Sequence, residues 1–575
     1  MTVSFRSALF PVIVIAAFAV TLAACGESSE ETGNPDTGGV TVVALDSTAP
    51  APLQLAVQAC AGLNNRVPGG SVYVEMNDYD QQWLDDLNLK PRKVVGAQDF
   101  LNACVTRFSA CVRYSYHDQQ ALLPNILTVA AVLGAVPLDV GLNATCSNVA
   151  FDATAEFKDN NTPYLATQYV FEHYIKQTTG LAMLDPGYDQ TNPNHADPPL
   201  THDMSSALVD YVFSRQLFVV FLNSGCTAST PENTLLSEIV NSGQWPTPLG
   251  VYGYNDSWFV FGGDLYEAET LCLPSRNMGQ IASTANNLSF FLSRRAPITD
   301  ANELQGSAPE AVQYDPGKTY VAFVVGDGDN IQYMLSARHD WFTERLADCA
   351  QPDNSCAPLT WTISPHLPDI APDVLQWYYK SAHQTGRDYF MLPPSGHLYA
   401  YPASLNEADQ DRFVTETERD ARILGVQGTV DWEWSTTWHQ AEDDFLPKYA
   451  TAGSSIRGVF PVNVPYLLPT FTWWPTDQFF EVLTGQDGGS VVLFRPREWR
   501  GVDGHDAQFF PTPQTMAEQL GSYPPGTVTW VYMTSDGGLT LQNSFMELVK
   551  LLPPNVQLVS GDAATKLALA ASGRR

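Results

Sequence analysis

The C-terminal half of this 575-residue chain repeats a strand-like run, a loop and a helix-like stretch, and this repeat limits the folds available to it. Eight runs rich in β-branched and aromatic residues begin about 30 to 40 residues apart, and they span residues 320–325, 359–363, 389–392, 426–430, 456–460, 490–494, 527–533 and 556–559. Strands that alternate with helices are typical of parallel sheets. The repeat predicts an α/β fold in which residues 318–575 form a (β/α)8 barrel of the TIM type.

A shorter alternation of the same kind precedes the predicted barrel. Residues 40–45 and 71–75 have strand composition, with a helical pattern at 53–63 between them, and similar runs recur up to about residue 300. We expect small α/β subdomains at 40–115, 116–215 and 216–300, followed by a polar linker at 301–317. No catalytic cluster is visible in these subdomains.

The N-terminus has the pattern of a bacterial export signal. An apolar run, Ala8 to Leu22, ends in the sequence LAAC, and it is too short to be a typical membrane span. Residues 1–25 therefore resemble a lipoprotein signal peptide whose lipobox ends at Cys25, the expected site of lipidation. Residues 26–39 are polar and predict a flexible tether. We expect an exported lipoprotein of the outer membrane or cell surface, held at the membrane through its lipid anchor only.

Charge and cysteine content bound the possible partners and cross-links. The chain has 62 acidic and 30 basic residues and a net charge of −32, which would repel nucleic acid. Eight cysteines remain besides Cys25, an even number that predicts disulfides in an exported protein. Two pairs are close in sequence, Cys104 with Cys111 and Cys349 with Cys356, and we expect each to form a bridge. The spacing does not fit a structural zinc site.

Polar and aromatic residues follow most of the predicted barrel strands, where active sites of such barrels lie. Each of the first seven predicted strands is followed by at least one residue with a carboxyl, imidazole, hydroxyl or indole group. In strand order these residues are Asp327, Asp329 and Asn330; His366; Ser395, His397, Tyr399 and Tyr401; Asp431, Trp432, Glu433 and Trp434; Trp473 and Trp474; Glu498; and Asp536. We expect these groups to share one cleft.

Carboxyl pairs on such loops suit glycoside hydrolysis, which needs a proton donor and an ionised partner. Glu433 lies between two tryptophans, whose desolvating effect would raise its pKa and make it the proton donor. Asp536, or else Asp327 and Asp329, would be the ionised partner, and Asp431 belongs to the same cleft. For one of the polar residues after the first strand the sequence equally predicts a helix N-cap.

Tryptophans in predicted loops are candidates for stacking against sugar rings, because exposed apolar surface often marks a binding site. Ten of the thirteen tryptophans follow residue 318. Those assigned to loops are Trp432, Trp434, Trp438, Trp473, Trp474 and Trp499.

Three stretches of this region carry a family resemblance. YVAFVVGDGDN (320–330), TISPHLPDIAPDVLQWYYKSA (362–382) and SGHLYAYP (395–402) resemble, in order, parts of the C-terminal domain of the GxGYxYP family of putative glycoside hydrolases. Gly396, Tyr399, Tyr401 and Pro402 fall on the motif, whereas Leu398 stands in place of its second glycine. The resemblance implies a carbohydrate substrate and glycosidase activity. The segment LNNRVPGGSVYVE (63–75) resembles the first N-terminal subdomain of the same family.

Two other classes of function stay open. A metal-dependent carbohydrate deacetylase would hold a divalent cation through Asp327 or Asp329 and His366, whereas the glycosidase needs no cofactor. A non-catalytic lipoprotein that captures glycans would keep the tryptophans and would not need carboxyls of shifted pKa. No GxSxG, P-loop or dinucleotide-binding pattern occurs in a fitting context.

Overall fold

Three small parallel sheets make up the region before residue 300. Their strands are β1 (Val40–Ala44), β2 (Val72–Glu75) and β3 (Arg92–Gly96) in the order β2-β1-β3; β4 (Ala110–Tyr114), β5 (Val136–Asp139) and β6 (Asn148–Asp152) in the order β5-β4-β6; and β7 (Leu181–Met183), β8 (Phe218–Val220), β9 (Leu249–Gly253) and β10 (Met278–Ile281) in the order β10-β9-β7-β8. All of their pairings are parallel. The α/β character expected from the sequence is confirmed, and the exact subdomain boundaries stay predictions.

Helices connect and cover these strands, as parallel pairing requires. They are α1 (Ala51–Asn64), α2 (Asp78–Asp86), α3 (Ala97–Phe108), α4 (Tyr116–Gln119), α5 (Leu123–Leu133), α6 (Ala153–Glu156), α7 (Pro163–Tyr174), α8 (Val209–Arg215), α9 (Pro231–Val240) and α11 (Leu288–Arg294). The computed structural model describes residues 39–573 except 91, 189–199, 223–228, 254–272, 352–355, 435–436, 465–477, 500–511 and 534–537. Among these residues no helix is long and apolar enough to cross a membrane. The predicted signal peptide, Cys25 and nearly all of the tether lie outside them.

Each of the eight strands predicted in the C-terminal half is present. They are β11 (Thr319–Val325), β12 (Leu359–Thr362), β13 (Asp388–Met391), β14 (Gly428–Trp434), β15 (Gly458–Val464), β17 (Ser490–Phe494), β19 (Val528–Met533) and β20 (Val556–Val559). Two further strands were not expected, β16 (Phe480–Thr484), which is antiparallel to β17, and the short β18 (Glu498–Trp499), which pairs with β19. The helices are α12 (Ile331–Met334), α13 (Ala337–Cys349), α14 (Leu367–Ile370), α15 (Pro372–Thr385), α16 (Glu407–Leu424), α17 (Trp438–Gln440), α18 (Pro513–Gly521), α19 (Gly538–Leu551) and α20 (Gly561–Ala571).

Backbone pairing arranges these strands in two sheets instead of one closed ring. One has the order β13-β12-β11-β19-β18 and the other β14-β15-β17-β16, and a single bridge between Leu392 and Thr429 connects them. The Thr319 N–H donates to Asn555 O, whereas the Tyr320 N–H donates to Thr527 O. Because successive N–H groups point to opposite edges of a strand, β20 lies on the β12 edge of β11 and not between β19 and β11. The described residues therefore form mostly parallel α/β sheets, and their pairing does not close an eight-stranded barrel.

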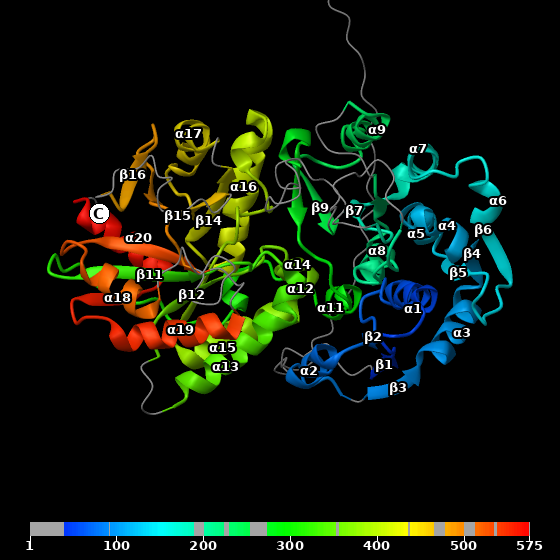
Figure 1. Ribbon diagram of the computed structural model, residues 1–575, viewed down its shortest axis with the longest axis horizontal. Coiled ribbons are helices and arrows are strands. Elements are labelled where there is room, and N and C mark those ends of the chain that lie inside the picture. Colours follow the sequence, from blue (N-terminus) through cyan, green and yellow to red (C-terminus); the bar gives the residue numbers. More distant parts are fainter. Residues whose placement is uncertain are drawn as a thin grey trace, which may run out of the picture. The chain divides into compact units, whose positions relative to one another are not determined.

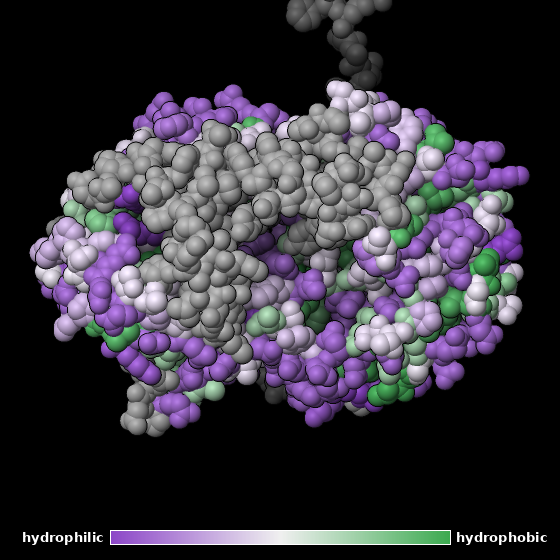
Figure 2. Space-filling model, viewed as in Figure 1, coloured by the Kyte–Doolittle hydropathy of each residue, from purple (hydrophilic) through white to green (hydrophobic). Residues whose placement is uncertain are grey.

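Both sheets contribute alternate side chains to one apolar cluster, which we call the inner cluster. It contains Tyr320, Ala322, Val324, Met391, Tyr399, Tyr401, Val430, Trp432, Phe460, Val462, Val492, Phe494, Val528, Trp530, Tyr532 and Val559, with four residues of α20. The intervening side chains of β11, such as Phe323, pack outward against α19, and α13, α15 and α19 lie together beside β11 and β12 (Figure 1). Of the described residues on the face shown in Figure 2, most are hydrophilic, and hydrophobic ones form only small groups. The large apolar side chains are thus mostly internal.

Three disulfides join described cysteines, and one of the two predicted pairs is wrong. Cys349 bonds to Cys356 as expected, but Cys104 bonds to Cys60 and Cys111 to Cys146. Cys104 lies on α3, which packs against α1, while Cys111 lies in β4 next to β6. The prediction from sequence spacing was wrong because Cys104 on α3 faces α1, whereas Cys111 on β4 faces the segment that leads into β6. Cys226 and Cys272 lie outside the described residues.

Candidate functional site

The turn at residues 326–330, which we call the aspartate turn, follows the fully buried strand β11. A Cβ on Gly326 would come within 1.9 Å of the Tyr532 hydroxyl, and one on Gly328 within 1.9 Å of the Thr362 carbonyl oxygen. Glycine is therefore required at both positions. The Gly328 N–H also donates to Thr362 Oγ1 at 2.9 Å. The turn is thus held between the carboxyl ends of β12 and β19.

The two carboxyl groups of the turn have unusual surroundings. Asp327 has a φ of 56°, in the left-handed region that few residues other than glycine adopt, and such backbone strain is often found at functional sites. The pKa of Asp329 is raised to about 8, mainly by burial and to a smaller extent by the neighbouring Asp327 carboxylate. Both side chains remain partly exposed. At neutral pH the Asp329 carboxyl therefore carries a proton and can donate it.

A buried arginine supports the turn from beneath. The Arg338 guanidinium donates to the carbonyl oxygens of Gly326 and Thr362, and it lies 5.1 Å from the ring centre of Trp361. Its positive charge opposes the rise in the Asp329 pKa, but burial outweighs it. No pattern in the sequence pointed to Arg338, because a single arginine in a polar helix usually lies at the surface. Thr362 could have been found, since it is the next-to-last residue of the second predicted strand.

Asn330 has the role of a helix cap. Its Oδ1 accepts from the Tyr333 N–H at 3.0 Å at the start of α12. The N-cap interpretation is therefore confirmed for this residue, which leaves the two aspartates as the candidates for chemistry.

The SGHLYAYP segment, residues 395–402, which we call the motif loop, is hydrogen-bonded to β14 and to the N-terminal region. Ser395 Oγ accepts from the Trp432 N–H and donates to Ala400 O, both at 2.8 Å. Tyr399 and Gln280 exchange backbone hydrogen bonds of 2.9 and 3.0 Å. Ser395 is thus an internal brace of the loop, and the loop extends the edge of β10.

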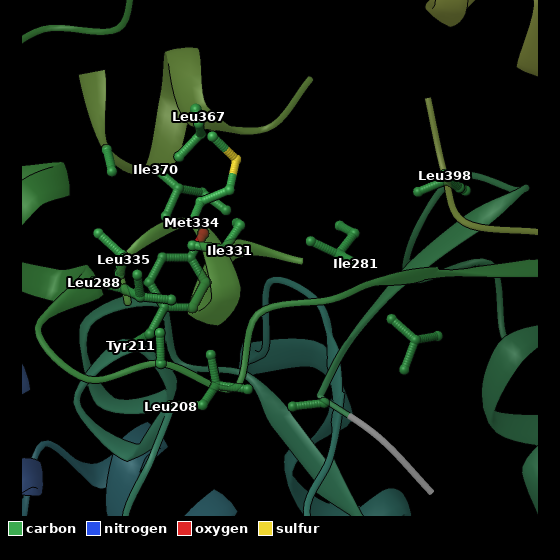
Figure 3. Packing of buried hydrophobic residues seen from close by; sticks show 14 of the residues in the cluster. Leu208, Tyr211, Ile281, Leu288, Ile331, Met334, Leu335, Leu367, Ile370 and Leu398 are labelled. Atoms are coloured by element: carbon green, nitrogen blue, oxygen red, sulfur yellow. The ribbon is translucent and has the colours of Figure 1, made fainter. Parts of the chain in front are cut away.

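Leu398, which replaces the motif's second glycine, fills space beside β10. Gly279 has no side chain there, and a Cβ at that position would approach the Leu398 Cβ to 2.7 Å. Figure 3 shows Leu398 and Ile281 in the same apolar cluster as Ile331 and Met334 of α12. The Ile331 N–H in turn donates to Ala282 O at 2.8 Å. The end of β10 therefore borders both the aspartate turn and the motif loop, a contribution of the N-terminal region that was not predicted.

His366 and His397 lie side by side, with ring centres 5.2 Å apart. His366 Nε2 donates to His397 O at 2.8 Å, and burial followed by the neighbouring His397 lowers the pKa of His366 to about 3. His397 Nδ1 is 2.7 Å from a carboxylate oxygen of the buried Asp420. His366 is therefore neutral, and only its Nδ1 remains for a ligand. Within the described segments, no group of three or more His, Cys, Asp or Glu side chains could hold a metal ion.

Asp431 and Glu433 lie inside β14 and not on a loop after it. Strand alternation directs them away from Val430 and Trp432, which belong to the inner cluster. Both are completely buried. Glu433 accepts from the Ala403 N–H at 2.7 Å and from Thr437 Oγ1 at 2.9 Å.

Burial raises the pKa of both Asp431 and Glu433 well above the ordinary range, and the nearby Asp431 carboxyl adds to the rise at Glu433. No hydrogen bond reaches either Asp431 oxygen from the described residues. The raised pKa predicted for Glu433 is confirmed, but the cause is burial on the face opposite Trp432. Neither carboxyl is exposed to a substrate in this conformation.

The aromatic residues expected to stack on sugars are largely internal. Trp432, Trp438 and Trp499 are at most 2% exposed, and the Trp432 ring packs 5.2 Å from that of Tyr399. Tyr401 is likewise buried. These side chains pack in the protein interior, whereas the sequence predicted that the loop tryptophans would be exposed. Asp536, Trp473 and Trp474 lie outside the described residues, as do the side chains of Trp434 and Glu498.

Comparisons with known proteins bear on the fold and on the family of the C-terminal region. The crystal structure of a putative hydrolase from Bacteroides thetaiotaomicron VPI-5482 is similar in fold, with a TM-score of 0.66 and 18% identity over 92% of this chain and 94% of that one. A 4-alpha-glucanotransferase from Thermococcus litoralis has a TM-score of only 0.29 and 12% identity, over 43% of this chain and 40% of that one. No curated protein matches the chain.

A family model matches residues 317–465, which include the aspartate turn, both histidines, the motif loop and β14. The N-terminal resemblance noted above lies outside this range and stays a prediction. Residues 317–465 are thus identified as a GxGYxYP putative glycoside hydrolase C-terminal domain, the family that the three motif stretches predicted.

Proposed function

We propose that this protein is a glycoside hydrolase that cleaves a poly- or oligosaccharide at the surface of a bacterial cell. The observation that carries the proposal is the pair of partly exposed carboxyls after β11, of which Asp329 holds a proton at neutral pH. The family match of residues 317–465 supports the substrate class. The LAAC sequence supports export and lipid anchoring at Cys25.

In this proposal Asp329 is the general acid that protonates the leaving glycosidic oxygen, and Asp327 is the ionised partner. The left-handed backbone at Asp327 and the fixed glycines on either side hold the two carboxyls in place before substrate binds. We further propose that the strands of the C-terminal region form a barrel-like ring whose carboxyl ends surround this turn. Asp431 and Glu433 remain a second candidate pair, and Asp536 remains a candidate partner.

Glycan hydrolysis by single-residue variants tests this assignment. Wild-type protein is incubated with plant, algal and bacterial glycans, and released reducing ends are measured. We expect Asp329→Asn to lower turnover roughly a hundred- to ten-thousandfold, the range of general acid catalysis. Asp315→Asn is the matched control, since exposed Asp315 also lies in a turn, accepting from the Gly317 N–H at 2.8 Å. Full activity of the Asp329 variant would remove the residue from the mechanism.

A further inference from the structure

A cavity of about 500 Å³ opens at the carboxyl ends of β1 and β2. Its wall includes Asn77 after β2, Asn286 after β10 and Gln332 on α12. The size is in the range of small-molecule sites, and the carboxyl ends of parallel strands are a common place for them. Thr284 Oγ1 donates to Gln332 Oε1 at 3.0 Å, and this hydrogen bond links the segment after β10 to α12 in the cavity wall. We call this space the amide cavity.

The charge of the lining favours a neutral ligand. No Lys, Arg or His is among the described residues that line the amide cavity. Asp80, which has the only carboxyl among the described lining residues, is 8% exposed and accepts from the Met76 N–H at 2.9 Å, the Asn77 N–H at 3.1 Å and Asn287 Nδ2 at 3.2 Å. Asp80 is thus committed to capping α2. Phosphate or carboxylate ligands would find no cation here.

Asn286, in the wall of the amide cavity, is hydrogen-bonded to the completely buried Gln58. Gln58 Nε2 donates to Asn286 Oδ1 at 3.3 Å and lies 3.3 Å from Met76 Sδ, a weak acceptor that is also 3.5 Å from Asn286 Nδ2. The completely buried Gln58 has no partner for its Oε1 among the described residues. Of the described residues only the Met76 sulfur accepts from Asn286 Nδ2, and this weak contact leaves the amide able to donate to a polar ligand in the cavity.

We propose that the amide cavity binds one or two units of a neutral saccharide. Sugar hydroxyls both donate and accept, which matches the side chains of Asn77, Ser205, Asn286 and Gln332, and the Tyr79 ring borders the same space. The ligand would bridge the first N-terminal sheet and α12, the helix that follows the aspartate turn. The proposal rests on the lining alone and not on catalysis at Asp329.

Binding by the full chain tests the proposal, measured by calorimetry with maltose, cellobiose, xylobiose and N-acetylchitobiose, and with digalacturonate and inorganic phosphate as charged probes. We expect at least one neutral disaccharide to bind and neither charged probe to do so. Ser205→Trp should fill the cavity mouth and abolish the binding. Ser242→Trp is the matched control and should leave it unchanged, because both serines are exposed and each accepts the N–H two residues ahead, at 3.2 and 3.3 Å.

Each outcome decides the proposal. It is overturned if no neutral probe binds, if phosphate or digalacturonate binds as well, or if binding survives in Ser205→Trp. Calorimetry does not depend on turnover, so saccharide binding without glycan hydrolysis would contradict only the proposed function. Hydrolysis with no binding at this cavity would contradict only this inference.

Discussion

Asp329→Asn should stabilise the protein at high pH while it removes activity. The folded-state pKa of Asp329 is about 8, against 3.8 for an ordinary Asp. The folded form therefore holds the proton more tightly than the unfolded chain does. The resulting contribution to stability is complete below about pH 4 and is lost as the pH rises through about 8.

One pKa unit corresponds to about 1.4 kcal/mol, so the shift sets an upper limit of roughly 6 kcal/mol, and partial exposure reduces the expected effect to roughly 1 to 3 kcal/mol. Because Asn cannot ionise, the variant should gain this amount over wild type at pH 9 and little at pH 5. Urea unfolding of both proteins at the two pH values measures the difference. Asp315→Asn should show no such dependence on pH. Equal stability of wild type and Asp329→Asn at pH 9 would refute the raised pKa.

Four further predictions concern the turn, β14, the metal requirement and the anchor. Gly328→Ala should destabilise the protein by about 1 to 3 kcal/mol or more, because its Cβ would overlap the Thr362 carbonyl; thermal unfolding measures this, and an unchanged midpoint would contradict the geometry. Glu433→Gln should keep the fold, since its side-chain oxygen can still accept from the Ala403 N–H, and loss of turnover with retained stability would assign catalysis to β14. EDTA should leave glycan release unchanged, whereas abolition would favour the metal-dependent deacetylase. Wild type should partition into detergent phase, and Cys25→Ser should remain in the aqueous phase.

The sequence predicted the strands well because each is a short apolar run bounded by polar loops. It could not predict that β20 would pair on the β12 edge of β11, since register between distant strands depends on packing that no local pattern encodes. The aspartate turn was identified because two glycines and three polar residues directly follow a buried strand. Arg338, which supports that turn, was missed because its burial depends on three other elements.

The stretch DWEW shows how a local pattern can mislead. Two carboxyls that alternate with two tryptophans suggested an exposed loop, but the alternation of a strand accounts for both residue types. Trp432 joins the inner cluster, while Asp431 and Glu433 face the opposite side. The strand had been ended too early in the prediction, at Val430, and this one boundary changed the expected surroundings of every residue that follows it.

The pairing of the motif loop with β10 bears on how the chain can be divided. A fragment starting at residue 317, where the family match begins, would lose the Gln280 partner of Tyr399 and the Ala282 carbonyl that accepts from Ile331. Leu398 would lose the groove that Gly250 and Gly279 leave for it. The limits of the recognisable domain are therefore not the limits of a cooperative folding unit, and grafting this domain onto another protein would require β10 to be carried with it.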